Sequence, residues 1–140
     1  QRVKKLVLLC SAGITPQRIS FLWRVVKFAL FGHNGADGSI RLIYKDGVLP
    51  QEAIDYIKLI SAHFNPVLYV PVLPDKTLSA IAAPALFIGG DEDVLLDSAK
   101  SIVRLKKLLP RFESVLLPGV GHAVTGQAER VIAFLQKELS

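Results

Sequence analysis

The chain has 140 residues, of which 51% are hydrophobic, and a formal net charge of +5. That length and apolar content suffice for one domain with a buried core, and the scattering of its basic residues argues against a nucleic-acid-binding protein. The only cysteine, Cys10, excludes an internal disulfide and favours a reducing, cytoplasmic compartment, and Arg24 and Lys27 keep the most apolar stretch shorter than a membrane span.

The chain opens with an apolar run over residues 3–9 that predicts a β-strand. A basic patch over residues 1–5 precedes the purely apolar part, residues 6–9, but this part is too short for the apolar region of a secretory signal. The absence of any Met, including one at the first position, indicates a processed or excised chain. We therefore expect the first residues to form part of the fold and not a targeting peptide.

A long helical insertion is predicted over residues 14–76. Residues 16–31 form an apolar helix with one narrow polar stripe, residues 32–38 end it with turn residues, and Pro50 begins a second amphipathic helix. The inward face of this second helix is predicted to consist of Ile54, Ile57, Ile60, Ser61 and Phe64. Because the segment is too long for an ordinary crossover, we interpret it as a lid-like cap. The alternative is a pair of ordinary sheet-covering helices joined by a loop.

The last third of the chain predicts strand, helix, strand and helix. Its strands are the apolar runs 85–88 and 114–117, which lack strict alternation. Such runs, separated by helical patterns, are typical of a parallel sheet that is covered on both faces. The fold class is therefore α/β, and the crossover between these two strands is expected to be right-handed.

The two helices of this region are predicted over residues 98–109 and 127–139. Asp97 or Ser98 caps the first helix, and Pro110 ends it. The residues predicted to face inward are Ala99, Ile102, Val103 and Leu109 in the first helix, and Ala128, Val131, Ile132, Leu135 and Leu139 in the second.

Each of the last two strands is followed by a turn that carries a chemically active side chain. Residues 90–93, Gly-Asp-Glu-Asp, follow one strand, and residues 119–122, Gly-Val-Gly-His, follow the other. Glycines at these turns let the backbone bend sharply and approach its neighbours closely. An imidazole that is held by a carboxylate activates a serine hydroxyl as a nucleophile, so an acid and a histidine at two strand ends indicate part of a catalytic triad.

His122 is the candidate base, and four acids compete to orient it. Asp97 is better explained as a helix cap and Glu92 as a solvated loop residue. Spacing alone leaves Asp91 and Asp93 as equal candidates. The plain alternative for His122 is a packing histidine in a glycine-rich loop.

Three segments together resemble the C-terminal half of an α/β-hydrolase with a cap domain. They read RVKKLVLL over residues 2–9, IAAPALFIGGDED over 81–93 and LPGVGH over 117–122. In that family a Gly-x-x-Asp turn carries the triad acid, and a Gly-His turn after the last strand carries the base. The resemblance therefore implies these roles for Asp93 and His122.

The fold implied by the resemblance is an incomplete α/β-hydrolase, with three parallel strands, covering helices and a helical cap insertion. Residues 1–13 and 77–140 then form the C-terminal part of the core, and residues 14–76 form the cap. The family's Gly-x-Ser-x-Gly elbow and its oxyanion loop precede these segments, so a missing N-terminal half or a partner chain is expected to supply them. Asp91 is then expected to form a hydrogen bond within its own turn.

Other residues are weaker candidates for the site. Ser11 ends the first strand, and the order Ser11, Asp93, His122 matches the family's triad, but Ser11 lacks the elbow glycines and lies one strand too late. Cys10 is expected to pack as a small apolar residue. The remaining histidines, His33 and His63, are interpreted as surface or structural residues.

The expected function is the hydrolysis of a small hydrophobic ester by the complete protein, with this chain inactive alone and with no cofactor or metal. Two alternatives remain open. One is a non-catalytic fragment or interaction module that needs a partner chain, or a second copy, to cover its exposed strand. The other is an enzyme of the same fold with another reaction, such as an acyltransferase, a dehalogenase or a carbon–carbon bond hydrolase.

Overall fold

The computed structural model describes residues 3–21, 23, 51–64 and 70–137. Most of the helix predicted over residues 16–31 lies outside the described residues, as do the predicted turn at 32–38, His33, Pro50 and Leu139.

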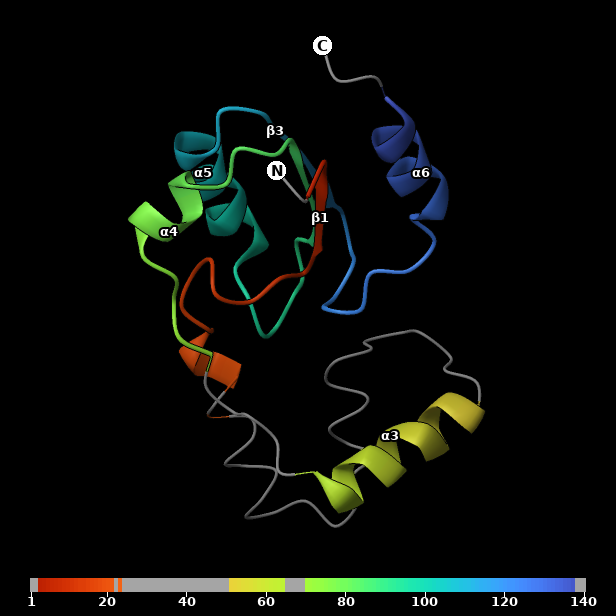
Figure 1. Ribbon diagram of the computed structural model, residues 1–140. Coiled ribbons are helices and arrows are strands. Elements are labelled where there is room, and N and C mark those ends of the chain that lie inside the picture. The colour runs from red at the N-terminus through yellow and green to blue at the C-terminus, as the bar shows by residue number, and fades with distance from the viewer. Residues whose placement is uncertain (1–2, 22, 24–50, 65–69, 138–140) are drawn as a thin grey trace.

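The elements follow one another in the predicted alternation of strands and helices (Figure 1). Their bounds are β1 (Leu6–Leu9), α3 (Gln51–His63), α4 (Asp75–Ser79), β2 (Ala85–Gly90), α5 (Ser98–Leu108), β3 (Phe112–Leu117) and α6 (Ala128–Gln136). None of these described helices has the length and apolar character needed to cross a lipid bilayer.

The strands form one parallel sheet in the order β1-β2-β3. Leu9 lies opposite Ile88, and Gly90 lies opposite Leu117, so the three carboxyl ends meet at one edge of the sheet. All of β2 is buried. In contrast, Glu113 and Leu116 of β3 are exposed, so the prediction that every strand is covered on both faces is wrong for β3, which pairs on one side only among the described residues.

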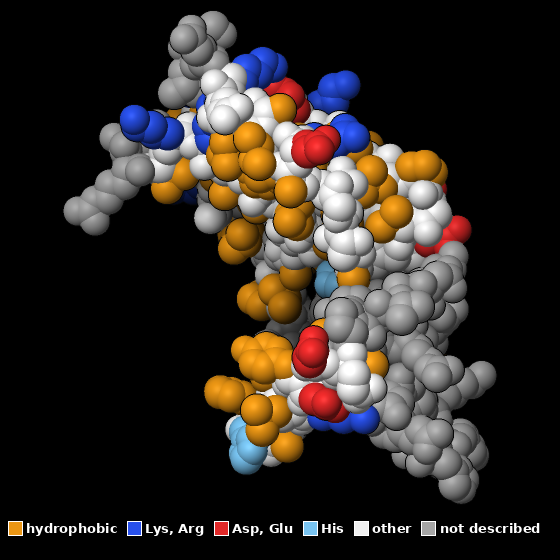
Figure 2. Space-filling view, turned by 90° about the vertical axis from the view of Figure 1, so that its right-hand side faces the viewer, with side chains coloured by type: hydrophobic (Ala, Val, Ile, Leu, Met, Phe, Trp, Pro, Cys, Tyr) orange, Lys and Arg blue, Asp and Glu red, His pale blue; other side chains and the backbone are white. Residues whose placement is uncertain are grey.

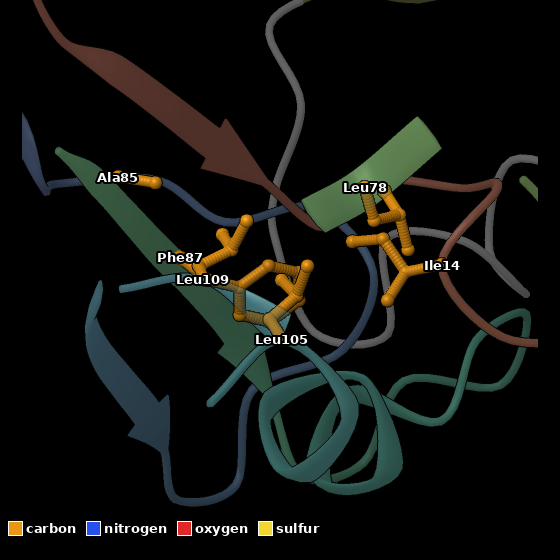
Figure 3. Packing of buried hydrophobic residues seen from close by; sticks show 6 residues of the cluster. All are labelled: Ile14, Leu78, Ala85, Phe87, Leu105 and Leu109. Carbon is orange, nitrogen blue, oxygen red and sulfur yellow. The ribbon is translucent and has the colours of Figure 1, made fainter. Parts of the chain in front are cut away.

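Helices cover both faces of the sheet (Figure 1). Because successive side chains of a strand point to opposite faces, β2 contributes apolar side chains to the core on each side. Ala85 and Phe87 point to the face covered by α4 and α5, whereas Leu86 and Ile88 pack against Phe134 of α6. Figure 3 shows the larger of the two clusters, in which side chains from α4, α5 and β2 meet. Its buried members are Ile14, Leu78, Ala85, Phe87, Leu105 and Leu109.

Helix α5 begins as predicted, and its predicted inward face is confirmed only in part: Ile102 and Leu109 pack in the core, whereas Ala99 is exposed. Asp97 caps the helix, since its Oδ1 accepts the backbone N–H of Lys100 at 3.0 Å. The buried side chains, however, are Ser98, Ser101 and Leu105, while Val103, predicted to face inward, is exposed.

The small serines of α5 face the sheet because the helix lies close to it. A Cβ atom at Gly89 would come within 2.5 Å of the Ser98 hydroxyl oxygen. The buried hydroxyl of Ser101 forms a 2.9 Å hydrogen bond with the Thr15 hydroxyl, so its polar group is not left without a partner. Close packing has therefore selected small residues over larger apolar ones at this contact.

The predicted inward face of α6 is also confirmed only in part, through Val131, which packs against the sheet. Phe134, absent from the predicted stripe, is buried, Val131 is half-buried, and Ile132 and Leu135 are exposed. The carboxyl end of α6 is held by Lys5, whose Nζ donates to the carbonyl oxygens of Phe134 at 2.7 Å and Leu135 at 3.1 Å. A cation at this end of a helix compensates its macrodipole and its unpaired carbonyls.

The two ends of the predicted insertion lie side by side. The backbone N–H of Leu73 donates to the Gly13 carbonyl at 2.8 Å. Arg104 of α5 donates to the carbonyls of Ile14 and Leu73 and forms an ion pair with Asp75. One arginine thus fastens both ends of the insertion to the core.

Helix α3 confirms that a helix follows Pro50, but not all of its predicted inward face. Ile54 and Ile57 are half-buried. Ile60 is 40% exposed and Phe64 is 69% exposed, so the later half of that face is not covered, and the side chain of Ser61 is not among those described.

The contact between Lys5 and α6 yields a stability prediction. We expect Lys5→Met to lower the free energy of unfolding by about 1–2 kcal/mol, because it removes charged hydrogen bonds to the helix end. Urea denaturation of the protein measures the change. Lys4→Met, at the exposed neighbouring lysine, is the matched control; equal losses in the two variants would show that Lys5 does not act through α6.

Candidate active site

The acid loop, residues 91–97, follows β2 directly. Asp93 in this loop is 1% exposed. Its Oδ1 accepts the backbone N–H groups of Leu95 at 2.8 Å and Leu96 at 3.0 Å, so the carboxylate is fixed by its own loop. This leaves Oδ2 for a partner from elsewhere in the fold.

That partner is His122 of the histidine loop, residues 118–127, which follows β3. The Nδ1 atom of His122 lies 2.9 Å from Asp93 Oδ2. The His122 side chain is 27% exposed, whereas that of Asp93 is fully buried, so the pair has one inner and one solvent-accessible member. The structure thus brings together the acid and the histidine that the sequence singled out.

The prediction that Asp91 forms a hydrogen bond within its own turn is wrong. Its Oδ1 accepts the backbone N–H of Gly119 at 2.8 Å, across the gap between the acid loop and the histidine loop. The N–H of Glu92 also donates across this gap, to the Val120 carbonyl at 3.1 Å. The prediction failed because the fold brings the histidine loop beside Asp91, so that its carboxylate meets the backbone N–H of Gly119. Gly119 has a φ of +70°, a backbone conformation that favours glycine. Asp91 therefore braces the loop that carries His122.

Hydrogen bonding keeps Asp93 ionised in spite of its burial. Burial is the largest single influence and would raise the pKa of Asp93, but the hydrogen bond from His122, those from Leu96 and Leu95, and the charge of His122 outweigh it. The net result is a pKa below the ordinary value for an aspartate. An ionised carboxylate at Nδ1 holds the imidazole with Nε2 available as a base.

Cys10 is the member of this cluster that sequence reasoning missed. One ligand atom from each of Cys10, Asp93 and His122 lies within 4.8 Å of the others. Burial is the largest influence on the Cys10 thiol and raises its pKa; the hydrogen bond with the Gly90 backbone lowers it, and the neighbouring Asp93 raises it further, so the net pKa lies above the ordinary value. A signal was present in the sequence, since Cys10 follows β1 just as the acid loop follows β2.

The other sequence candidates do not join the pair. Ser11 is half-buried and forms no hydrogen bond with His122 among the described residues. His63, at the end of α3, is exposed, and Asp97 serves as the cap of α5.

Comparison with known proteins supports the fold. No protein-family model and no curated protein matches the chain, but solved structures do. The carboxylesterase CesB (YbfK) from Bacillus subtilis matches 99% of this chain with 53% of its own, at 18% identity and a TM-score of 0.76. The naproxen esterase (carboxylesterase NP) from Bacillus subtilis matches 96% of this chain with 52% of its own, at 21% identity and a TM-score of 0.79.

A 2-hydroxy-6-oxo-6-phenylhexa-2,4-dienoate hydrolase (BPHD) from Rhodococcus sp. strain RHA1 matches 95% of this chain with 53% of its own, at 21% identity and a TM-score of 0.65. The chain thus spans about half the length of these structural neighbours. The predicted fold, that of the C-terminal half of an α/β-hydrolase, is confirmed.

The approach of the two loops depends on Gly90, which yields a second prediction. A Cβ atom at this position would lie 2.0 Å from the carbonyl oxygen of Val120, which is backbone and cannot rotate away. We expect Gly90→Ala to cost about 3 kcal/mol in unfolding free energy, measured by urea denaturation, because the histidine loop must move.

Gly126→Ala separates this clash from backbone strain. Gly126 has a φ of +70° but nothing within 4 Å of an added Cβ, so we expect a loss of about 1 kcal/mol. A Gly90→Ala variant that is no less stable than Gly126→Ala would contradict the close approach of the loops.

The ionisation of Asp93 yields a third prediction. The folded-state pKa of Asp93 is lower than its unfolded-state pKa, so its contribution to stability is complete above about pH 4 and is lost as the pH falls through the folded-state value. We expect Asp93→Asn to be less stable than the unchanged protein at pH 7 and this difference to shrink on acidification. Urea denaturation across pH 3–7 measures it, and a gap independent of pH would contradict the ionised pair.

Proposed function

We propose that this chain supplies the general base and its orienting acid to a serine-type α/β-hydrolase with esterase-like activity. The observation that carries the proposal is the hydrogen bond of 2.9 Å between His122 Nδ1 and the buried carboxylate of Asp93, at the edge where the parallel strands end. The fold supports it, and esterases are among the solved structures that share that fold.

The proposed chemistry is acyl transfer through a serine. His122 Nε2 removes the proton of the serine hydroxyl while the serine oxygen attacks the ester carbonyl carbon. The imidazolium then gives this proton to the departing alcohol as the carbon–oxygen bond breaks, leaving an acyl-enzyme. Water, deprotonated by the same Nε2, releases the acid and regenerates the serine. Asp93 keeps its charge throughout, holding the imidazole and stabilising the imidazolium.

The nucleophile is proposed to lie outside these 140 residues, on a Gly-x-Ser-x-Gly elbow. Two observations support this. The chain spans about half the length of its structural neighbours, and β1 pairs on one side only among the described residues. A further parallel strand at that edge would end beside Cys10 and place a following serine near His122.

Residues 14–76 are proposed to form the cap over this site. The fastening of both ends of the segment to the core by Arg104 is what a cap insertion requires. Figure 2 shows hydrophobic side chains along one concave side of the molecule, both on the core and on the part of the chain that contains α3, residues 51–64. The exposed apolar residues on and just after α3 are Tyr56, Leu59, Ile60 and Phe64. They favour a hydrophobic acyl or alkyl group in the substrate.

A second candidate is a non-catalytic module that needs a partner chain. The observation in its favour is the apolar surface at the outer edge of β1, which has no strand partner in the described part of the chain and where Leu9 and the preceding Val3 are exposed. The same surface is expected of a hydrolase half that lacks its neighbouring strand, so the two candidates differ in chemistry and not in shape.

Replacement of the acid tests the catalytic proposal. In the protein that contains this chain, we expect Asp93→Asn to lower kcat for a short-chain p-nitrophenyl ester by about four orders of magnitude, because the wrong imidazole tautomer is then favoured. Glu92→Gln, in the same loop and exposed, is the control and should retain activity. A loss below about tenfold in Asp93→Asn would remove Asp93 from this role.

A fluorophosphonate probe, which phosphonylates an activated serine, locates the nucleophile in the same protein. The label should map outside residues 1–140 and should persist in Ser11→Ala. Labelling of Ser11 would overturn the proposed elbow. Absence of both labelling and ester turnover in the protein would favour the non-catalytic module.

A further inference from the structure

We propose that Cys10, Asp93 and His122 form a zinc site whose occupation is incompatible with the base role of His122. Zinc bound at this site would inhibit the enzyme and would not act as its cofactor. Its inhibitory consequence rests on the proposed hydrolase function, whereas the binding of the ion does not.

The geometry of the cluster is close to what zinc requires. One ligand atom of each residue lies within 4.8 Å of the other two, and the closest pair, His122 Nδ1 and Asp93 Oδ2, is 2.9 Å apart. Zinc bonds of 2.0–2.3 Å in a tetrahedron separate the ligand atoms by about 3.2–3.7 Å. The widest separation must therefore close by at most about 1–1.5 Å and the His122–Asp93 pair must open by less than about 1 Å, changes that small χ rotations shared by the side chains can supply.

The three ligand types suit this ion and its charge. Thiolate, imidazole and carboxylate are the groups that bind Zn²⁺ in proteins. A thiolate from Cys10 and the carboxylate of Asp93 together carry two negative charges, which neutralise the ion in a place where an uncompensated charge would be costly. Cys10 and Asp93 are both buried, and the partial exposure of His122 leaves a path from solvent.

The surrounding backbone supports the carboxylate in the way that metal ligands are usually supported. The N–H groups of Leu95 and Leu96 both bind Oδ1 of Asp93. They orient the carboxylate while Oδ2 remains directed to His122. The ion would replace the proton that His122 and Asp93 now share.

The protons balance as follows. Binding of Zn²⁺ displaces the thiol proton of Cys10 to solvent, and the imidazole, still neutral, carries its proton on Nε2 once Nδ1 binds the ion. An Nε2 that holds a proton cannot accept one from a serine. Zinc binding and general-base catalysis therefore exclude each other.

The test is a titration of the purified protein with Co²⁺, used as a spectroscopic substitute for Zn²⁺, followed by displacement with Zn²⁺. We expect one equivalent of Co²⁺ to produce a thiolate-to-cobalt charge-transfer absorption that Zn²⁺ abolishes. Cys10→Ser, which keeps the size of the side chain but removes the soft ligand, should eliminate this absorption and weaken Zn²⁺ binding at least about tenfold. His63→Gln, at an exposed histidine on α3, is the matched control and should bind as before.

His122→Gln provides an independent check if Cys10→Ser alters the fold, as judged by circular dichroism, and it should also weaken Zn²⁺ binding. Absence of the charge-transfer absorption in the unchanged protein would overturn the proposal. So would Zn²⁺ affinity that is unaffected by Cys10→Ser and His122→Gln but falls in His63→Gln, which would locate the ion at the surface.

The kinetic arm distinguishes this proposal from the proposed function. If esters are hydrolysed, Zn²⁺ should inhibit the unchanged protein, and Cys10→Ser should be inhibited only at concentrations at least about tenfold higher. Ester hydrolysis insensitive to Zn²⁺ would overturn the inhibitory site and leave the hydrolase intact. Zinc binding in a protein that hydrolyses no ester would support the site and count against the hydrolase.

Discussion

Parallel pairing of β1, β2 and β3 is the constraint on which the candidate site depends. It delivers Cys10, the acid loop and the histidine loop to one edge of the sheet, because parallel strands in register end together. The bare backbone of Gly90 then lets the acid loop lie against the backbone around Val120. Because β2 is buried along its whole length, the acid loop that carries Asp93 starts from a strand packed on both faces.

The same edge explains how a carboxylate remains charged inside the protein. Asp93 loses its water, but N–H donors from Leu95, Leu96 and His122 replace it, and the balance lowers its pKa. Asp91, two residues earlier, is exposed and braces Gly119 instead. Asp91 therefore holds the loop that carries His122, and Asp93 holds the His122 ring.

Residue pattern was a good guide to the order of elements and a poor guide to their packing. The strands and helices of the last third occur close to the expected bounds, because apolar runs and helical periodicity are local properties. The faces of α5 and α6 were predicted only in part: Ile102, Leu109 and Val131 pack against the core as expected, whereas Val103, Ile132 and Leu135 are exposed. Ser98 and Ser101 face the sheet in α5 because the helix approaches Gly89, and Phe134 fills the contact of α6. Hydrophobicity alone does not encode how closely two elements approach.

The amino-acid sequence determined that β2 and β3 each end in a glycine-bearing turn, one with acids and one with His122, since these are matters of composition and spacing along the chain. Spacing alone left Asp91 and Asp93 as equal candidates, the family resemblance favoured Asp93, and the place of Cys10 after the first strand indicated only the sheet edge at which it lies. Only the tertiary structure established that the Asp93 carboxylate meets the imidazole, that Asp91 turns to Gly119 instead, and that the thiol of Cys10 lies beside the pair. Those contacts join residues as far apart as Cys10 and His122, and such contacts depend on strand pairing and loop approach, which no local pattern specifies.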